Sequence, residues 1–339
     1  MNKPLLNEVT IEITNHCQLH CRQCGIWAEK ERHQMSSSLV VRMMRELLAR
    51  YSINFVSITG GEPFLNPDCG RMIKAMSLFR SRGKIKEFGI YSNAAYTAGI
   101  QRVFTIHADY LPGMQMGISI DGDRPTHDRL RGDGAYKKTL KTIEWIVDNF
   151  GKDIILDFKF TVNRVNFSQM AKVYQLAKYY KARFTPKAME ADVSHYYHRH
   201  RMPGTIALAA LTPQMIKSIR GQVDRILNDG YHGVDRELVK GMMVLLSAKE
   251  KCIAACETPA RALFINSRRW VYPCIYMSPA GRLGSKGELP KELDRVRQLH
   301  AAQAAKGQCP GCNAYHGFLK KFNLQYLALE ASLRNQAAG

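Results

Sequence analysis

The chain has 339 residues, 45% of them hydrophobic and 23% charged, which is enough to build a sizeable core. Its 49 basic and 29 acidic residues give a net charge of +20, as in proteins that bind nucleic acids, acidic membranes or acidic substrates. The sequence carries no signature of a common nucleic-acid-binding fold, no membrane-spanning apolar segment and no secretory signal. We expect a cytoplasmic protein without a membrane or nucleic-acid partner, whose nine cysteines favour metal sites over disulfides.

Strand-like and helix-like runs alternate along the first 190 residues. The predicted strands are Val9–Thr14, Ile53–Thr59, Glu87–Tyr91, Gln115–Ile120, Ile154–Val162 and Ala182–Met189. The predicted helices are Ser37–Tyr51, Pro67–Phe79, Tyr136–Asn149 and Ser168–Tyr180. This order predicts a parallel sheet with helices on its outer face, and about six units fit before residue 200. We therefore predict an α/β fold, a partial (β/α)6 TIM-like barrel over residues 1–200. A helical connection (201–250) and a small C-terminal Cys-rich α+β domain (251–339) follow.

The strand at Ile154–Val162 predicts a polar interior for this barrel. Its apolar residues, such as Phe158 and Phe160, alternate with Asp157 and Lys159. The outer helices need the apolar face, so the polar side chains are expected to point inward. A polar interior suits a polar ligand better than it suits a closed core.

A CxxxCxxC motif, formed by Cys17, Cys21 and Cys24, follows the first predicted strand. Three thiolates on one loop can bind three irons of a cubane cluster and leave the fourth iron open to a ligand. A structural zinc site needs a fourth protein ligand, and none lies nearby in the sequence. The motif therefore favours an iron–sulfur cluster with an open coordination site.

A TGGEP segment at residues 59–63 follows the second predicted strand. Its glycines let the backbone approach a ligand closely, and the carboxylate of Glu62 can accept hydrogen bonds from an ammonium group. With both motifs in place, residues 7–190 resemble the radical S-adenosylmethionine (SAM) superfamily. The resemblance implies that the three cysteines hold a [4Fe–4S] cluster, whose free iron binds the methionyl amine and carboxylate of SAM.

The resemblance extends to two further strand ends. Residues 91–94 (YSNA) look like the segment that meets the ribose or carboxylate of SAM, and residues 119–132 resemble the strand-four signature of peptide-modifying members. The cofactor-binding residues implied in this way are Gly60, Gly61, Glu62, Ser92, Asn93, Ser119, Asp121 and Arg131. One position departs from the family, because Gln23 replaces the aromatic residue that packs on adenine, and the adenine contact must then come from elsewhere.

The remaining cysteines are Cys69, Cys252, Cys256, Cys274, Cys309 and Cys312. Cys69 begins a predicted helix and is interpreted as a small buried hydrophobe. The apolar runs between Cys256 and Cys274 predict a hairpin that brings these two residues together. Cys309 and Cys312 form a CxxC pair. Four thiolates from this pair and the hairpin can hold either a zinc ion or a cubane cluster.

This tail resembles the SPASM and Twitch auxiliary-cluster domains, and the shorter Twitch form fits better because no cysteine follows Cys312. The resemblance implies a second, auxiliary [4Fe–4S] cluster held by Cys256, Cys274, Cys309 and Cys312. A glycine is common five residues before the second ligand, where this chain has Arg269. The leftover Cys252 can be an alternative ligand, a buried thiol or a hydrogen-atom donor to a substrate radical.

The resemblance implies a radical SAM oxidoreductase or epimerase, supplied with electrons by a flavodoxin- or ferredoxin-type donor. We expect it to modify a peptide by epimerisation, crosslinking or oxidation, and the basic chain suits an acidic substrate. The first strand starts near residue 9, so we expect no leader-binding domain ahead of the barrel. The alternatives are radical chemistry on an aminocyclitol, a nucleoside sugar or another natural product and, in another class, a basic nucleic-acid-binding iron–sulfur or zinc protein.

Overall fold

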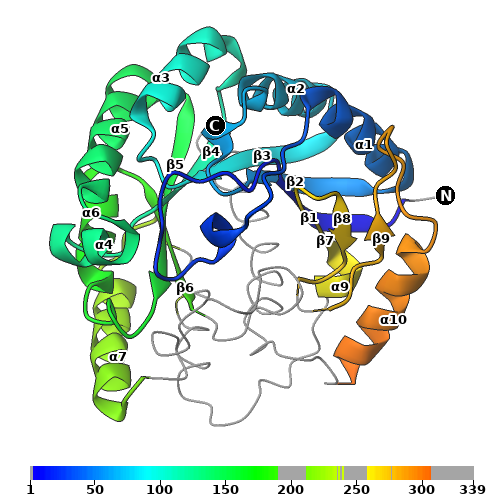
Figure 1. Cartoon of the computed structure of the whole chain (residues 1–339). Helices are drawn as coiled ribbons and strands as arrows, with labels where there is room; N and C mark the ends of the chain where they lie inside the picture. The colour runs from blue at the N-terminus through cyan, green and yellow to red at the C-terminus, as the bar shows by residue number, and fades with distance from the viewer. Residues whose placement is uncertain are drawn as a thin grey trace, which may run out of the picture.

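The computed structural model describes residues 3–189, 211–234, 236, 239, 258–275 and 277–306. Within these residues one curved sheet has the strand order β6-β5-β4-β3-β2-β1-β7-β8-β9, and its first six strands run parallel (Figure 1). Those six are β1 (Leu5–Glu12), β2 (Ser52–Thr59), β3 (Ile85–Ser92), β4 (Met114–Ser119), β5 (Ile154–Val162) and β6 (Arg183–Ala188). The predicted α/β fold with a partial barrel is confirmed.

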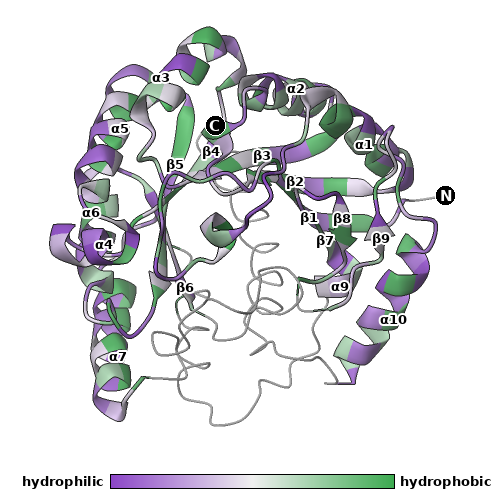
Figure 2. Ribbon diagram, viewed as in Figure 1, coloured by the Kyte–Doolittle hydropathy of each residue, from purple (hydrophilic) through white to green (hydrophobic). Residues whose placement is uncertain are grey.

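Helices cover the outer face of this sheet (Figure 1). They are α1 (Ser37–Arg50), α2 (Cys69–Ser81), α3 (Thr97–Ile106), α5 (Ala135–Phe150), α6 (Met170–Tyr179) and α7 (Pro213–Asn228). The short helix α4 (Arg124–Arg131) follows β4 and lies against α5 and the loop after β1. Figure 2 shows hydrophilic residues along their outer surfaces, while apolar side chains fill the layer between helices and sheet. The sequence did not predict α3 and α4, the second of which carries Arg131.

The pleat of β5 confirms the predicted two-sided barrel wall. Phe158 and Phe160 are fully buried on the helix-covered side. On the inner side Asp157 pairs with Lys159 at 2.5 Å and accepts a hydrogen bond from Thr185 of β6 at 2.8 Å. The Lys159 ammonium also lies 5.3 Å from the centre of the Tyr91 ring. The barrel interior therefore has a connected polar wall.

The C-terminal described part extends the same sheet. After α9 (Thr258–Arg261), β7 (Ala262–Ile265) pairs in parallel with β1, and β8 (Trp270–Tyr272) and β9 (Gly281–Arg282) follow antiparallel. The predicted hairpin is thus present at β7–β8, although the predicted domain boundaries near residues 200 and 250 lie outside the described residues. The last described helix is α10 (Leu293–Ala305). None of the helices in the described ranges is long and apolar enough to cross a lipid bilayer.

Candidate functional site

The candidate site is formed by the loops at the carboxyl ends of β1 to β4, where parallel strands place ligand-binding residues. The loop after β1 carries Cys17, Cys21 and Cys24. The Cys24 amide donates to the Cys21 carbonyl at 3.1 Å, and the Trp27 indole Nε1 donates to that carbonyl oxygen at 3.1 Å as well. These bonds fold the loop tightly around its cysteines, and Trp27 is a contributor that the sequence reasoning missed.

The three cysteines are neighbours that act on one another electrostatically, with Cys21 buried and Cys17 and Cys24 half-buried. Burial raises the pKa of Cys17 to about 12 and that of Cys24 to about 11, and it also raises the pKa of Cys21. Cys21 lies close enough to the other two to raise their pKa further, while the Arg131 charge acts in the opposite direction on Cys21 and Cys24. Buried thiols of this kind become thiolates when a metal binds them.

Gly60 and Gly61 pack the loop after β2 directly against the cysteine loop. The Gly61 amide donates to the Thr14 carbonyl at 2.8 Å, and the Glu62 amide donates to the His16 carbonyl at 2.7 Å. A Cβ on Gly60 would lie 2.5 Å from the Thr14 oxygen, and a Cβ on Gly61 would overlap the His16 carbonyl. The glycines are therefore needed for contact with the chain's own backbone, whereas the sequence suggested an approach to a ligand.

Glu62 is a buried carboxylate at the centre of these loops. It accepts hydrogen bonds from the Ser92 hydroxyl at 2.9 Å and from the Asn93 amide at 3.0 Å, and burial raises its pKa to about 7. Among the described residues no basic side chain forms an ion pair with it, and Arg131 acts on its pKa from a longer distance. A buried carboxylate in this state favours a cationic ligand such as an ammonium group.

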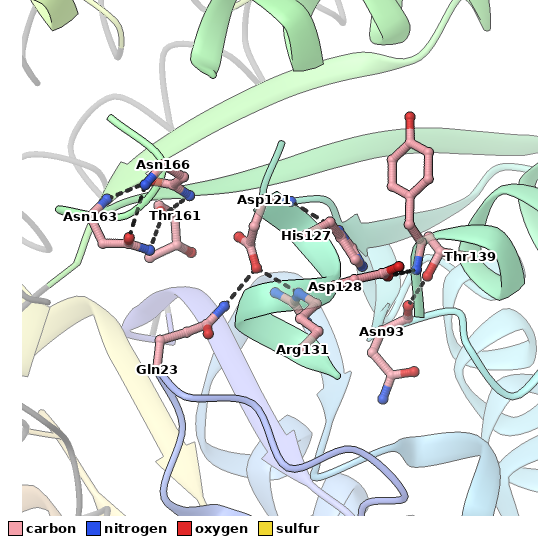
Figure 3. Close-up of polar contacts among 11 residues, drawn as sticks. Gln23, Asn93, Asp121, His127, Asp128, Arg131, Thr139, Thr161, Asn163 and Asn166 are labelled. Atoms are coloured by element: carbon pink, nitrogen blue, oxygen red, sulfur yellow. Dashed lines mark hydrogen bonds and ion pairs between the residues drawn. The ribbon is translucent and has the colours of Figure 1, made fainter. Parts of the chain in front are cut away.

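Asn93 joins the loop after β3 to the cysteine loop. Its Nδ2 donates to Cys17 Sγ at 3.6 Å, and its Oδ1 accepts from Gln18 Nε2 at 3.0 Å. Its backbone carbonyl accepts from the Thr139 hydroxyl of α5 at 3.0 Å (Figure 3). The next residue, Ala94, has a φ of 55°, which is uncommon outside glycine and marks a tightly constrained turn. The motifs after β1, β2 and β3 thus meet at one place.

The loop after β4 is tied to the cysteine loop by a shared carboxylate oxygen. Asp121 Oδ2 accepts from Gln23 Nε2 at 2.6 Å and from Arg131 Nε at 2.6 Å, as Figure 3 shows. The Asp121 side chain is fully buried and that of Arg131 is 10% exposed. A backbone bond of 2.8 Å from Arg22 to Leu130 adds a second link between the cysteine loop and α4.

Several buried polar atoms near this pair accept or donate no hydrogen bond within the described part of the chain. They are Gln23 Oε1, Asp121 Oδ1 and His127 Nε2. The other ring nitrogen of His127, Nδ1, accepts from the Asp121 amide at 3.2 Å, and burial lowers the pKa of His127 to about 4. His127 is therefore neutral near pH 7, and the site has polar groups that a ligand can satisfy.

The other predicted site residues are placed as follows. Ser119 ends β4, two residues before Asp121, and pairs in register with Lys159. Cys274 follows β8 and is partly buried, whereas Cys252, Cys256, Cys309 and Cys312 lie outside the described residues. Cys69 is fully buried in α2, as the sequence predicted.

The donor set at the cysteine loop fits a cluster. Among the described residues, no three His, Cys, Asp or Glu side chains are arranged to hold a single metal ion. A cubane cluster does not need that arrangement, because each cysteine binds a different iron. Three neighbouring thiols that are buried or half-buried, a nearby arginine and unpaired polar atoms are the features that such a cluster and a polar ligand require.

The fold and these loops agree with the comparison to known families. Residues 11–177 match the model described as the Radical SAM superfamily. The chain belongs to this superfamily, and membership implies SAM and a [4Fe–4S] cluster as cofactors.

Individual relatives are distant and match part of their length. The chain is 27% identical over 168 residues to the sporulation killing factor maturation protein SkfB of Bacillus subtilis (strain 168), covering 49% of this chain and 38% of SkfB. It is 23% identical over 175 residues to a probable GTP 3′,8-cyclase of Saccharolobus solfataricus (strain ATCC 35092 / DSM 1617 / JCM 11322 / P2), covering 51% of this chain and 53% of the cyclase. The chain thus spans from about two fifths to about half of these relatives.

A solved structure extends the likeness beyond the barrel. Native anSMEcpe with bound AdoMet and Cp18Cys peptide superposes with a TM-score of 0.63 at 16% sequence identity, covering 97% of this chain and 99% of that chain. At this identity the likeness shows the fold, which includes the region after the sixth parallel strand.

Proposed function

We propose that the chain is a radical SAM enzyme that cleaves SAM reductively and abstracts a hydrogen atom from a substrate in the barrel. Cys17, Cys21 and Cys24 hold the cluster, and Glu62 accepts hydrogen bonds from the methionyl ammonium group. The further cofactor-binding residues are Gly60, Gly61, Ser92, Asn93, Ser119, Asp121 and Arg131. A cluster held by these cysteines would supply the electron that splits SAM into methionine and a 5′-deoxyadenosyl radical, and that radical would take the hydrogen atom from the substrate.

The observation that carries this proposal is the meeting of three motifs around Glu62. Asn93 donates both to Glu62 and to Cys17, so one residue joins the carboxylate to a cysteine of the loop. The chain's own residues thus present thiols, a buried acceptor for a cation and the Arg131 charge side by side. Arg131 offsets part of the negative charge of the thiolates and of a bound carboxylate.

The test is SAM cleavage by anaerobically reconstituted protein with dithionite, read as 5′-deoxyadenosine. The wild-type protein should release this product, and a Cys17→Ala, Cys21→Ala, Cys24→Ala variant should release none. The control is Gln34→Ala, a substitution of an exposed residue outside the cysteine motif. This variant should cleave SAM as the wild type does. A wild-type protein that binds iron but never splits SAM contradicts the proposal.

For the tail we propose an auxiliary [4Fe–4S] cluster held by Cys256, Cys274, Cys309 and Cys312. It is supported by the β7–β8 hairpin that leads to Cys274 and by the fold likeness to anSMEcpe. The wild type should then bind about eight irons per chain, and the triple cysteine variant about four. Residual zinc in that variant, without iron, would instead identify a structural zinc site.

For the substrate we propose a peptide. SkfB is a maturation protein by name, and the anSMEcpe structure contains a bound peptide. The test is to co-express the enzyme with short peptides encoded next to its gene and to measure the peptide mass. Crosslinking or oxidation should lower the mass by the hydrogen atoms lost, and epimerisation in D2O should raise it by the deuterium taken up. Cys252→Ala should stop an epimerisation while both clusters and SAM cleavage persist, if Cys252 donates the hydrogen atom.

A second candidate substrate class is a nucleoside or sugar derivative. It is favoured by the similarity of residues in the barrel to a probable GTP 3′,8-cyclase. Incubation with nucleotides and aminocyclitols, followed by mass spectrometry, distinguishes this class from peptides. In either case we propose a flavodoxin- or ferredoxin-type electron donor, which should replace dithionite in the SAM-cleavage assay.

A further inference from the structure

Exposed basic residues lie beside the cysteine loop where this loop meets α4. Arg22 stands between Cys21 and Cys24 in the sequence, and its amide donates to the Leu130 carbonyl of α4 at 2.8 Å. This bond brings the backbone of Arg22 beside that of α4, in which Arg129 precedes Leu130. Both arginines are exposed, and neither forms an ion pair within the part of the chain that the structure describes.

The first turn of α5 adds two exposed lysines, Lys137 and Lys138, near the same loop. The next residue, Thr139, donates to the Asn93 carbonyl at 3.0 Å, as Figure 3 shows. Asn93 in turn donates to Cys17 Sγ at 3.6 Å. Short series of contacts thus connect α4 and the first turn of α5 with the loop that carries the cysteines.

The charges in the first turn of α5 are opposite to those that stabilise a helix. Aligned peptide dipoles make this end partly positive, so acidic residues stabilise it and lysines destabilise it. The turn contains no acidic residue, and the N-cap Gly134 has no side chain that could accept from the free amides. The nearby acidic residues are Asp128, which pairs with Arg124 at 3.7 Å, and the exposed Asp133. Helix stability therefore does not favour these lysines, whereas binding of an anionic partner does.

We propose that the exposed bases beside the cysteine loop form the docking surface of an acidic, flavodoxin-type electron donor. They are Arg22, Arg129, Lys137 and Lys138, and we call them the basic surface. The electron has to reach the loop that holds the proposed cluster, so the donor has to bind beside this loop. In the transfer the flavin of the donor loses one electron and the cluster gains it. The proposal rests on the proposed function and adds the place where the donor binds.

The test reverses two charges of the basic surface in the variant Lys137→Glu, Lys138→Glu. Glutamate suits the first turn of a helix, so this variant should fold and bind iron as the wild type does. SAM cleavage driven by dithionite should stay unchanged. Cleavage driven by a low concentration of reduced flavodoxin should fall by about tenfold or more, because the donor is no longer attracted to the surface. Added salt should slow the flavodoxin-driven reaction of the wild type more than that of the variant.

The matched control is Lys84→Glu, Lys86→Glu, which changes the net charge by the same amount. Both lysines are exposed at the amino end of β3, and Ser92, where the site loop begins, lies about 20 Å further along this strand. The control should keep the flavodoxin-driven rate close to that of the wild type. Calorimetric binding of oxidised flavodoxin to all three proteins tests the surface independently of SAM cleavage.

Several results overturn the proposal. They are a wild type that does not bind flavodoxin, an unchanged flavodoxin affinity in Lys137→Glu, Lys138→Glu, and an equal loss in the control. A dithionite-driven rate that falls by the same factor would place the effect at the cysteine loop itself. Tighter binding of a short RNA duplex than of flavodoxin, lost in the same variant, would assign the surface to nucleic acid. A wild type that binds flavodoxin but never cleaves SAM with dithionite contradicts the proposed function and leaves the docking surface in place.

Discussion

Glu12, the last residue of β1, accepts two hydrogen bonds from Ser267, one from its amide at 3.0 Å and one from its hydroxyl at 2.5 Å. Ser267 belongs to the turn between β7 and β8, and the next residue, Arg268, pairs with Glu29 beyond the cysteine loop. The turn therefore contacts the chain on both sides of the loop that carries Cys17, at Glu12 before the loop and at Glu29 after it. This contact spans 255 residues of sequence.

Glu12 makes stability depend on pH. Burial raises its pKa from 4.5 to about 7, so between these values the folded state holds a proton that the unfolded state has lost. The resulting stabilisation is complete below pH 4.5 and is lost as the pH rises to about 7, up to roughly 3 kcal/mol. Glu12→Gln should flatten this decline when urea unfolding of cluster-free protein is measured from about pH 5 to about pH 8.

Glu62 contributes a similar decline, because burial raises its pKa to about 7 as well. His127, whose pKa burial lowers from 6.5 to about 4, contributes the opposite trend between these two values, so the prediction is the difference in slope between the wild type and Glu12→Gln. Glu46→Gln on the outside of α1, where the carboxylate is 47% exposed, is the matched control and should keep the full slope. An unchanged slope in Glu12→Gln would show that Glu12 is ionised in the fold throughout this range.

Arg269 occupies a backbone conformation that favours glycine. Its φ is 71°, in the left-handed region, at the position where the resemblance to auxiliary-cluster domains led us to expect a glycine. Arg269→Gly should therefore raise the free energy of unfolding by about 0.5–1 kcal/mol, after the greater freedom of glycine in the unfolded chain is subtracted. Arg269→Ala should give no such gain, since alanine meets the same backbone penalty. Equal stability of the two variants would rule out backbone strain as the cause.

Gly61 should tolerate no side chain. A Cβ there would overlap the His16 carbonyl and lie 2.9 Å from the Cys17 Cβ, and both neighbours belong to the cysteine loop. Gly61→Ala should lower the free energy of unfolding by at least about 2 kcal/mol and reduce the iron bound on reconstitution. Gly221→Ala is the matched control, because a Cβ at this helical position meets nothing within 4 Å. It should stabilise the protein by about 0.5–1 kcal/mol.

The buried pair of Asp121 and Arg131 should show strong coupling in a double-mutant cycle. Removing one partner leaves the other charge buried without its counter-ion, so Asp121→Leu or Arg131→Met alone should cost about 3–5 kcal/mol. The double variant should cost clearly less than the sum, as measured by urea unfolding of cluster-free protein. Additive losses would mean that the two charges do not stabilise each other. The exposed pair Lys172 and Asp123 should couple by less than about 1 kcal/mol.

Local patterns in the sequence predicted the barrel wall and the cysteine loop well. The bounds of β5 follow from alternating apolar and polar residues, which reflect the two environments of a sheet covered on one face. The clustering of the three thiols follows from their spacing on one short loop. Both features depend on neighbours in sequence, and local pattern therefore suffices to predict them.

Features that depend on distant partners could not be predicted in this way. The helix α4 has the polar sequence RPTHDRLR and buries His127 and Arg131, so no apolar stripe marks it. Gln23 was recognised as a departure from the family, but its partner Asp121 lies 98 residues away. The pairing of β7 with β1 likewise depends on a contact across most of the chain.

The place of β1 in the sheet has a consequence for local opening. It is hydrogen-bonded to β2 on one side and to β7 on the other, so it is an interior strand, while β6 and β9 form the edges of the described sheet. Fraying begins at edges, and interior strands exchange their amide protons only through larger openings. The loop that follows β1 is thus attached to a strand whose amide protons should exchange slowly. Local opening of the edge strands should therefore leave the positions of its cysteines unchanged.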